Sequence, residues 1–195
     1  MVEQKDSLLQ PEDSLIQPED IKRLLAFPAE CKEVDYKAAV GFGKQPDFNA
    51  KLVRHILGFA NSGGGHIVIG YKEQIDRSHV PDPDMTDEIA ASYDVTPLCE
   101  YVERYIEGQD RIKIKVHREE YGGTRYPIIC IYPFEQYPLY CTRGCGSEKG
   151  GAQILTEGHI YMRIEGARTI VVATIHDLPS WRQLIMKIGL YSGKR

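Results

Sequence analysis

Residues 48–71, FNAKLVRHILGFANSGGGHIVIGY, decide the fold of this chain. Their first part places apolar side chains at the spacing of one helix face. These side chains are Phe48, Leu52, Ile56 and Phe59. The residues at 67–69 then form a short apolar run that is typical of a core strand. The stretch therefore predicts an amphipathic helix followed by a buried strand.

Five residues join this helix to this strand, and they have two interpretations. They are Asn61, Ser62, Gly63, Gly64 and Gly65. Their backbone N–H groups could cradle a phosphate, with Lys37 or Lys44 supplying charge. Alternatively, they form a tight connection that needs positive φ, which glycine adopts because it lacks a Cβ. The loop is not a P-loop, because no Gly-Lys-Ser/Thr follows and the C-terminus of a helix disfavours anions.

A second dense segment, residues 30–37, packs three carboxylates and two lysines into eight residues. Together with the central stretch and residues 159–169, it resembles the Schlafen/AlbA-like family of DNA-binding domains. The matching positions are Glu30, Asp35-Tyr36-Lys37, Phe59-Ala60-Asn61, Gly64-Gly65, Ile69-Gly70, His159–Arg163 and Ala167-Arg168-Thr169. The resemblance runs from Glu30 to Leu178. This chain departs from the family at Asp35, where Glu is usual, and at Tyr71-Lys72-Glu73, where an acidic pair is usual.

The resemblance implies a nucleic-acid partner and, in certain relatives, a metal-dependent ribonuclease whose three acids match Glu30, Asp35 and Glu73. Hard divalent cations such as Mg²⁺ or Mn²⁺ prefer carboxylate oxygens, and such ions promote phosphodiester cleavage. Lys37, two residues after Asp35, would stabilise developing negative charge. The alternative is that these acids simply pair with nearby lysines, as surface charges commonly do. The residues fix no cofactor, and binding without catalysis is the favoured interpretation.

Basic residues with aromatic neighbours form the candidate nucleic-acid surface. They are Lys37, Lys44, Lys51, Arg54, Arg163 and Arg168. Lysine and arginine contact phosphates, and aromatic rings such as those of Tyr36, Phe42 and Tyr161 stack on unpaired bases. A solvated basic face is the alternative for Lys51 and Arg54. An ATP-binding or protein-interaction module is a third hypothesis for the chain, since some relatives are described as ATP-binding.

The cysteines suggest a reducing compartment. There are five, at positions 31, 99, 130, 141 and 145, without the spacing of a disulfide framework. Cys141, Cys145 and His159 could hold zinc, but a single C-x₃-C lacks the usual four ligands. No apolar run approaches the ~20 residues that span a bilayer. The expectation is a soluble cytoplasmic protein with no membrane partner.

The net charge of −4 is unevenly distributed along the 195 residues. Residues 1–20 contain six acids and one base, so the rest of the chain has a net charge of +1. A nucleic-acid site must therefore be a local patch. The first twenty residues also contain a duplicated seven-residue segment, DSLLQPE followed by DSLIQPE, and two copies are too few for a solenoid. We expect an acidic, flexible arm over 1–20, or a helix that docks on a neighbouring subunit, and a single domain over 21–195.

The remaining pattern predicts an α+β fold in which a mixed sheet packs against three to four helices. Helices are expected over 21–26, from Asp47 as N-cap, from Thr96 to Ile106, and from Asp177 onward. Strands are expected over 34–39, 111–117, 126–132, 139–142 and 159–164, and a polar connection over 71–94. Along 111–117 the apolar and basic residues alternate, which predicts a strand with a basic outer face. A homo-oligomer is left open.

Overall fold

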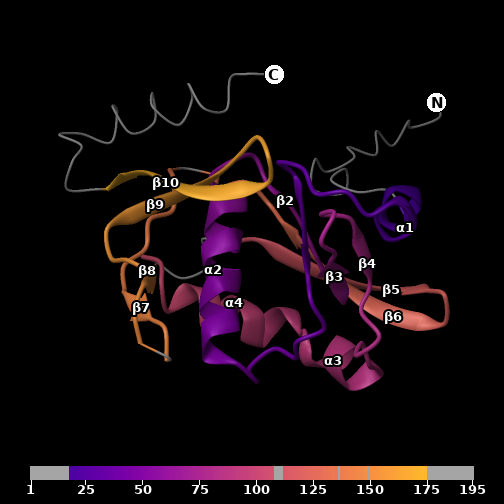
Figure 1. Ribbon diagram of the computed structural model, residues 1–195. Helices are drawn as coiled ribbons and strands as arrows, with labels where there is room; N and C mark the ends of the chain where they lie inside the picture. Colours follow the sequence, from indigo (N-terminus) through magenta and orange to yellow (C-terminus); the bar gives the residue numbers. More distant parts are fainter. Residues whose placement is uncertain (1–17, 108–111, 136, 149, 175–195) are drawn as a thin grey trace, which may run out of the picture.

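The computed structural model describes residues 18–107, 112–135, 137–148 and 150–174. Its centre is a four-stranded mixed sheet in the order β1-β2-β6-β5 (Figure 1). The strands are β1 (Val34–Lys37), β2 (Gly65–Ile69), β6 (Thr124–Ile131) and β5 (Ile114–Tyr121). β1 and β2 are parallel, whereas β2 pairs with β6 and β6 with β5 in antiparallel fashion. The expected α+β class with a mixed sheet is confirmed.

Helices cover both faces of this sheet, which is why β1, β2 and most of β6 are buried, whereas β5 at the edge is largely exposed. One face packs against α2 (Pro46–Ala60) and α4 (Val95–Glu103), and Ile67, Ile69 and Phe59 belong to this core. The other face packs against α1 (Pro18–Ala26) and α3 (Asp87–Ser92), together with the hairpin of β3 (Tyr71–Glu73) and β4 (His79–Pro81). Successive residues of β2 alternate between the two cores, because strand side chains alternate between faces.

A second antiparallel hairpin lies against α2, outside the central sheet (Figure 1). It consists of β9 (His159–Ile164) and β10 (Arg168–Thr174), and it follows a small hairpin of β7 (Cys145–Gly146) and β8 (Gln153–Leu155). Gly58 of α2 permits the close approach, since a Cβ there would lie 2.8 Å from Cγ2 of Thr169. The 159–164 strand is confirmed, but its expected place in the central sheet is wrong.

Several local expectations need correction. Asp47 does not cap α2: the N-cap is Gln45, and the Asp47 carboxylate instead accepts hydrogen bonds from Ser147 and Glu148. α4 begins at Val95 with Asp94 as its cap. Residues 139–142 form no strand, and the 71–94 connection contains β3, β4 and α3. The duplicated arm over 1–17 and the helix expected from Asp177 lie outside the described residues.

Candidate functional site

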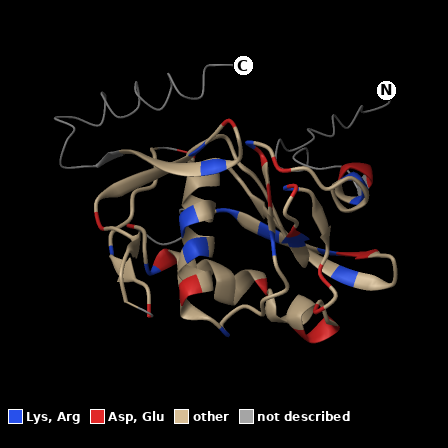
Figure 2. Ribbon diagram, in the orientation of Figure 1, with Lys and Arg blue, Asp and Glu red and all other residues tan. Residues whose placement is uncertain are grey.

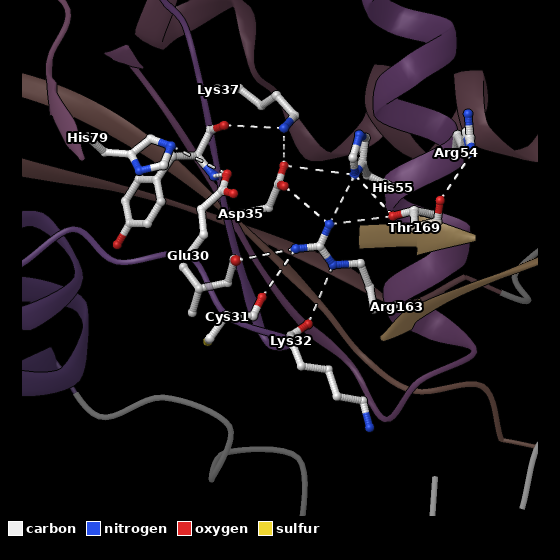
Figure 3. Close-up of polar contacts among 12 residues, drawn as sticks. Glu30, Cys31, Lys32, Asp35, Lys37, Arg54, His55, His79, Arg163 and Thr169 are labelled. Atoms are coloured by element: carbon white, nitrogen blue, oxygen red, sulfur yellow. Dashed lines mark hydrogen bonds and ion pairs between the residues drawn. The ribbon is translucent and has the colours of Figure 1, made fainter. Parts of the chain in front are cut away.

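Arg163 of β9 is the centre of a buried polar cluster that joins three elements (Figure 3). None of its side chain is exposed. Its guanidinium donates to the carbonyl oxygens of Cys31 and Val34 at 3.2 and 3.4 Å and to Asp35 Oδ1 at 3.2 Å. It also lies 4.6 Å from the ring centroid of Phe59. The β9–β10 hairpin is thereby tied to β1 and to α2.

This burial corrects the prediction that Arg163 contacts a phosphate directly. A phosphate oxygen cannot reach a guanidinium whose donors are already bonded inside the protein. Even its backbone is engaged, because its N–H donates to Ser62 Oγ at 2.8 Å and its carbonyl accepts from the same hydroxyl at 3.3 Å. Arg163 therefore supports the surface from below and does not belong to it.

Asp35 is the acidic partner of this cluster, on the β1 face that looks toward α2. Its side chain is 3% exposed and pairs with both Arg163 and Lys37. Lys37, two residues further along β1 and therefore on the same strand face, remains 23% exposed. His55 of α2 lies beside them, with Nδ1 3.9 Å from Asp35 Oδ2 and 3.2 Å from Thr169 Oγ1. The pairing of Asp35 with Lys37 is what the non-catalytic alternative predicted for this acid, whereas Lys72 pairs with Asp82 and Asp84 and not with Glu73.

The cluster favours an ionised Asp35 and a neutral His55. Burial alone would raise the pKa of Asp35, but the charges of His55 in its protonated form, of Lys37 and of Arg163 hold that pKa below its ordinary value. Burial lowers the pKa of His55 to about 3, against a smaller upward effect of Asp35. Because His55 is uncharged at neutral pH, Lys37 and Arg163 are the cations that keep the Asp35 carboxylate charged.

The three candidate metal-binding carboxylates lie in different surroundings. Glu30 accepts from the backbone N–H of Tyr36 at 3.3 Å and lies 3.5 Å from His79 Nε2 (Figure 3). Glu73 is exposed on β3, where it is the strand partner of His79. Asp35 instead points toward α2. Within the described ranges no three acids, histidines or cysteines lie close enough to hold one ion, so the expected convergence of Glu30, Asp35 and Glu73 is not observed.

The glycine-rich junction at 61–65 acts as a helix terminus and an anchor. The N–H groups of Ser62 and Gly64 both donate to the carbonyl of Phe59 at 2.9 Å. The buried Asn61 side chain donates to Leu139 O and Tyr161 O and accepts from Leu139 N. These groups are therefore occupied, which favours the tight connection over the phosphate cradle. Positive φ is confirmed for Gly63, Gly64 and Gly65, at 98°, 89° and 156°.

The remaining basic positions divide into two places. Lys51 and Arg168 are exposed, and Arg54 lies between α2 and β10, donating from Nη2 to Thr169 O at 3.1 Å. Figure 2 shows basic positions along α2 and on the strand that crosses above it. Lys44 is exposed in the loop before α2, beyond Asp47 of the first turn. We call Lys51, Arg54 and Arg168 the basic stripe.

The family model described as Schlafen, AlbA_2 matches residues 30–171. The chain belongs to the Schlafen AlbA_2 family. The matched range begins at Glu30 and ends within β10, so it includes the buried cluster and the basic stripe. Membership fits a role connected with nucleic acids. No curated protein matches.

Two of the solved structures that match are similar to this Schlafen AlbA_2 chain over most of its length. The DIP2311 protein from Corynebacterium diphtheriae is 16% identical with a TM-score of 0.48, and the match covers 79% of this chain and 26% of that one. This chain thus spans about a quarter of the length of DIP2311. The N-terminal domain of a RecG-related protein from Nitrosomonas europaea, described as a candidate ATP-dependent DNA helicase, is 19% identical with a TM-score of 0.43. That match covers 81% of this chain and 94% of that domain.

The aromatic and cysteine candidates of this Schlafen AlbA_2 domain are mostly internal. Tyr36 and Tyr161 are buried, so they are not platforms for unpaired bases, while Phe42 is half-buried against Tyr93 and Tyr101. Cys141 is buried and half-buried Cys145 lies in β7. Both are free thiols, and with His159 they form no three-ligand group in the part of the chain that the structure describes.

Sequence reasoning missed three residues on which this Schlafen AlbA_2 site depends: His55, Asn61 as an anchor, and Thr169 as a side-chain partner. The sequence does contain one indication of the buried polar cluster around Arg163. Asp35 stands between two apolar side chains, Val34 and Tyr36, in a buried strand, and a buried acid requires a cation.

No helix in the described part of the chain is long and apolar enough to cross a bilayer.

Proposed function

We propose that this Schlafen AlbA_2 domain binds nucleic acid through the basic stripe of Lys51, Arg54 and Arg168. Family membership supports a nucleic-acid partner in general. The location of the binding surface is inferred from the distribution of charged residues along the chain and on the structure. Outside residues 1–20 the chain is close to neutral, so attraction to phosphates must come from a local group of cations.

One observation carries this proposal: Arg54 Nη2 donates to Thr169 O, directly beside Arg168. The bond joins α2 to β10 one residue after Arg168. Lys51 lies three residues before Arg54, hence on the same side of α2. Asp47, one turn further toward the N-terminus, is held by Ser147 and Glu148, so its negative charge lies at the end of the stripe.

The three side chains differ in what they can contribute. Lys51 and Arg168 are exposed and can reach a phosphate by rotation of their long stems. Arg54 is half-buried, with its guanidinium carbon 5.4 Å from the ring centroid of Tyr161. It therefore adds a fixed positive charge at the base of the stripe and holds α2 to β10.

Replacement of Lys51 and Arg168 together by alanine is expected to weaken binding and to reduce its dependence on salt. Each lost phosphate contact removes about one unit from the slope of log K against log salt on a duplex, and about 0.7 on a single strand. Fluorescence anisotropy with a labelled single strand and a labelled duplex, over a series of salt concentrations, measures both quantities.

The matched control is the double alanine variant of Lys22 and Arg23, which removes the same charge from exposed positions of α1. It is expected to bind like the wild type. The proposal is overturned by equal losses in the two double variants, by an unchanged slope in the stripe variant, or by no binding in the wild type. A parallel incubation with RNA and Mn²⁺ tests the ribonuclease alternative, for which strand cleavage is the positive result.

A further inference from the structure

β5 is the terminal strand of the central sheet and is long for an edge strand. It has eight residues, and β6 is its neighbour on one side. Among the described strands none pairs with its other side. The hairpin that it forms with β6 extends away from the body of the molecule (Figure 1). An open edge presents backbone donors and acceptors that can pair with another strand.

The hydrogen-bond pattern shows which residues of β5 point outward. Lys113 O accepts from Tyr132 N at 3.0 Å, just before the strand, so odd-numbered residues direct their backbone groups toward β6. The two-residue turn after Tyr121, with φ of 61° at Gly122 and 78° at Gly123, agrees with this phase. The outward-pointing backbone groups therefore belong to Ile114, Val116, Arg118 and Glu120.

An open hollow of about 380 Å³ runs along this edge. Five consecutive residues of β5, at 114–118, line it, together with Asp94 and Val95 at the start of α4. Consecutive strand residues point to opposite faces, so a hollow that contacts all of them is open along the backbone edge itself. Val95 adds an apolar side chain that is 39% exposed.

The side chains of β5 make the edge complementary to itself. The first half is basic at Lys115 and the second half is acidic at Glu119, and both lie on the same face because they are four residues apart. An antiparallel copy of the strand reverses this order. It therefore places the acid of one copy opposite the base of the other, where cross-strand pairs of opposite charge are favourable.

We propose that β5 pairs antiparallel with β5 of a second copy of this chain, about a two-fold axis at His117. In this register Lys115 faces Glu119 of the second copy, and Glu119 faces Lys115 of the second copy. Val116 and Arg118 then occupy hydrogen-bonded positions, in agreement with the outward direction of even-numbered backbone groups. The two charged pairs fall on non-hydrogen-bonded positions, where opposing side chains are closest.

A second copy fits this edge better than an unrelated peptide. A two-fold interface requires one surface to complement itself, and β5 meets that requirement with one base and one acid placed symmetrically about His117. An edge that binds an acidic peptide needs cations along its whole length, whereas Glu119 and Glu120 lie in the second half of β5. The product is a continuous sheet across two molecules.

Two charge reversals test the proposed register. Lys115→Glu places two glutamate pairs across the axis and Glu119→Lys places two lysine pairs, so each variant is expected to associate at least about tenfold more weakly than the wild type. An equal mixture of the two variants restores both opposite-charge pairs in a mixed dimer. Sedimentation velocity over a range of concentrations, on the full chain without nucleic acid, measures the association of each sample.

Arg143→Glu is the matched control, because it makes the same charge change as Lys115→Glu at an exposed position outside both β5 and the basic stripe. It is expected to dimerise like the wild type, and thermal melts verify that all variants are folded. A wild type that stays monomeric at every concentration overturns the proposal, as does a mixture that associates no better than its components. Since no nucleic acid is present, the result is independent of the proposed binding function.

Discussion

At the scale of single residues, Arg163 and Asp35 form a buried ion pair that joins β9 to β1. The two charges are buried, Arg163 Nη1 lies 3.2 Å from Asp35 Oδ1, and the guanidinium also donates to the carbonyls of Cys31 and Val34. A buried ion pair adds little net stability compared with apolar residues, yet removal of one member leaves an uncompensated charge. The pair therefore ties β9 to β1 at one point, while the hairpin itself packs against α2.

Replacement of Asp35 by Asn is expected to lower the free energy of unfolding by about 3–5 kcal/mol, because Arg163 would remain buried without its counter-charge. Urea denaturation measures the change. Asp84→Asn is the control: Asp84 pairs with Lys72 at 2.9 Å but is 76% exposed, and surface pairs contribute about 1 kcal/mol or less. A loss at Asp35 no greater than that at Asp84 would contradict the structural role of the buried pair.

Arg163 also shows why the role of a residue is harder to predict from the sequence than its place in the family pattern. The resemblance to the family gives the position of Arg163 in the pattern, but it does not show whether the side chain faces the solvent or the interior. A strand pattern shows which side chains share a face, and only tertiary packing decides which faces are covered. Here α2 and β1 cover the arginine, and no local signal in residues 159–164 reports that contact.

At the scale of elements, the junction of α2 and β2 was predictable because its information is local. The apolar spacing, the glycines and the following strand all lie within 24 residues of sequence. The β9–β10 hairpin was not predictable in its place, because its partner α2 lies about one hundred residues earlier, as the bond from Arg163 N to Ser62 Oγ illustrates. The same difficulty applies to Asn61, because its side-chain partners, Leu139 and Tyr161, lie 78 and 100 residues later in the sequence.

Gly64→Ala is expected to lower the melting temperature more than Gly63→Ala does. Both residues have positive φ, 89° and 98°, so both alanines meet a backbone penalty of about 1–2 kcal/mol. A Cβ at Gly64 would in addition lie 2.7 Å from the carbonyl oxygen of Ile131, whereas nothing lies within 4 Å of one at Gly63. Differential scanning calorimetry of both variants isolates the steric contribution to the loss of stability. Equal melting temperatures would show that β6 moves away from the added Cβ without loss of stability.

At the scale of the whole molecule, stability depends on histidines that fold in a neutral state. Burial lowers the pKa of His55 to about 3 and that of His66 to about 4, from an ordinary value of 6.5. Between these values the unfolded chain binds more protons than the folded chain, so stability decreases as the pH falls. Asp35 acts in the same direction at lower pH, because its lowered pKa adds stability that is lost as the carboxylate becomes protonated.

The urea midpoint is therefore expected to fall steadily as the pH decreases from 6.5 toward 4, and the His55→Gln/His66→Gln variant is expected to show a shallower fall. Glutamine keeps a polar side chain but cannot accept the proton that the unfolded chain takes up. Above pH 7.5 the histidines are neutral in both states, so the midpoints there give the direct cost of the substitutions and serve as the reference. If the variant keeps the full pH dependence of the wild type after that correction, other groups govern it, and the buried cluster around Asp35 and Arg163 does not require a neutral His55.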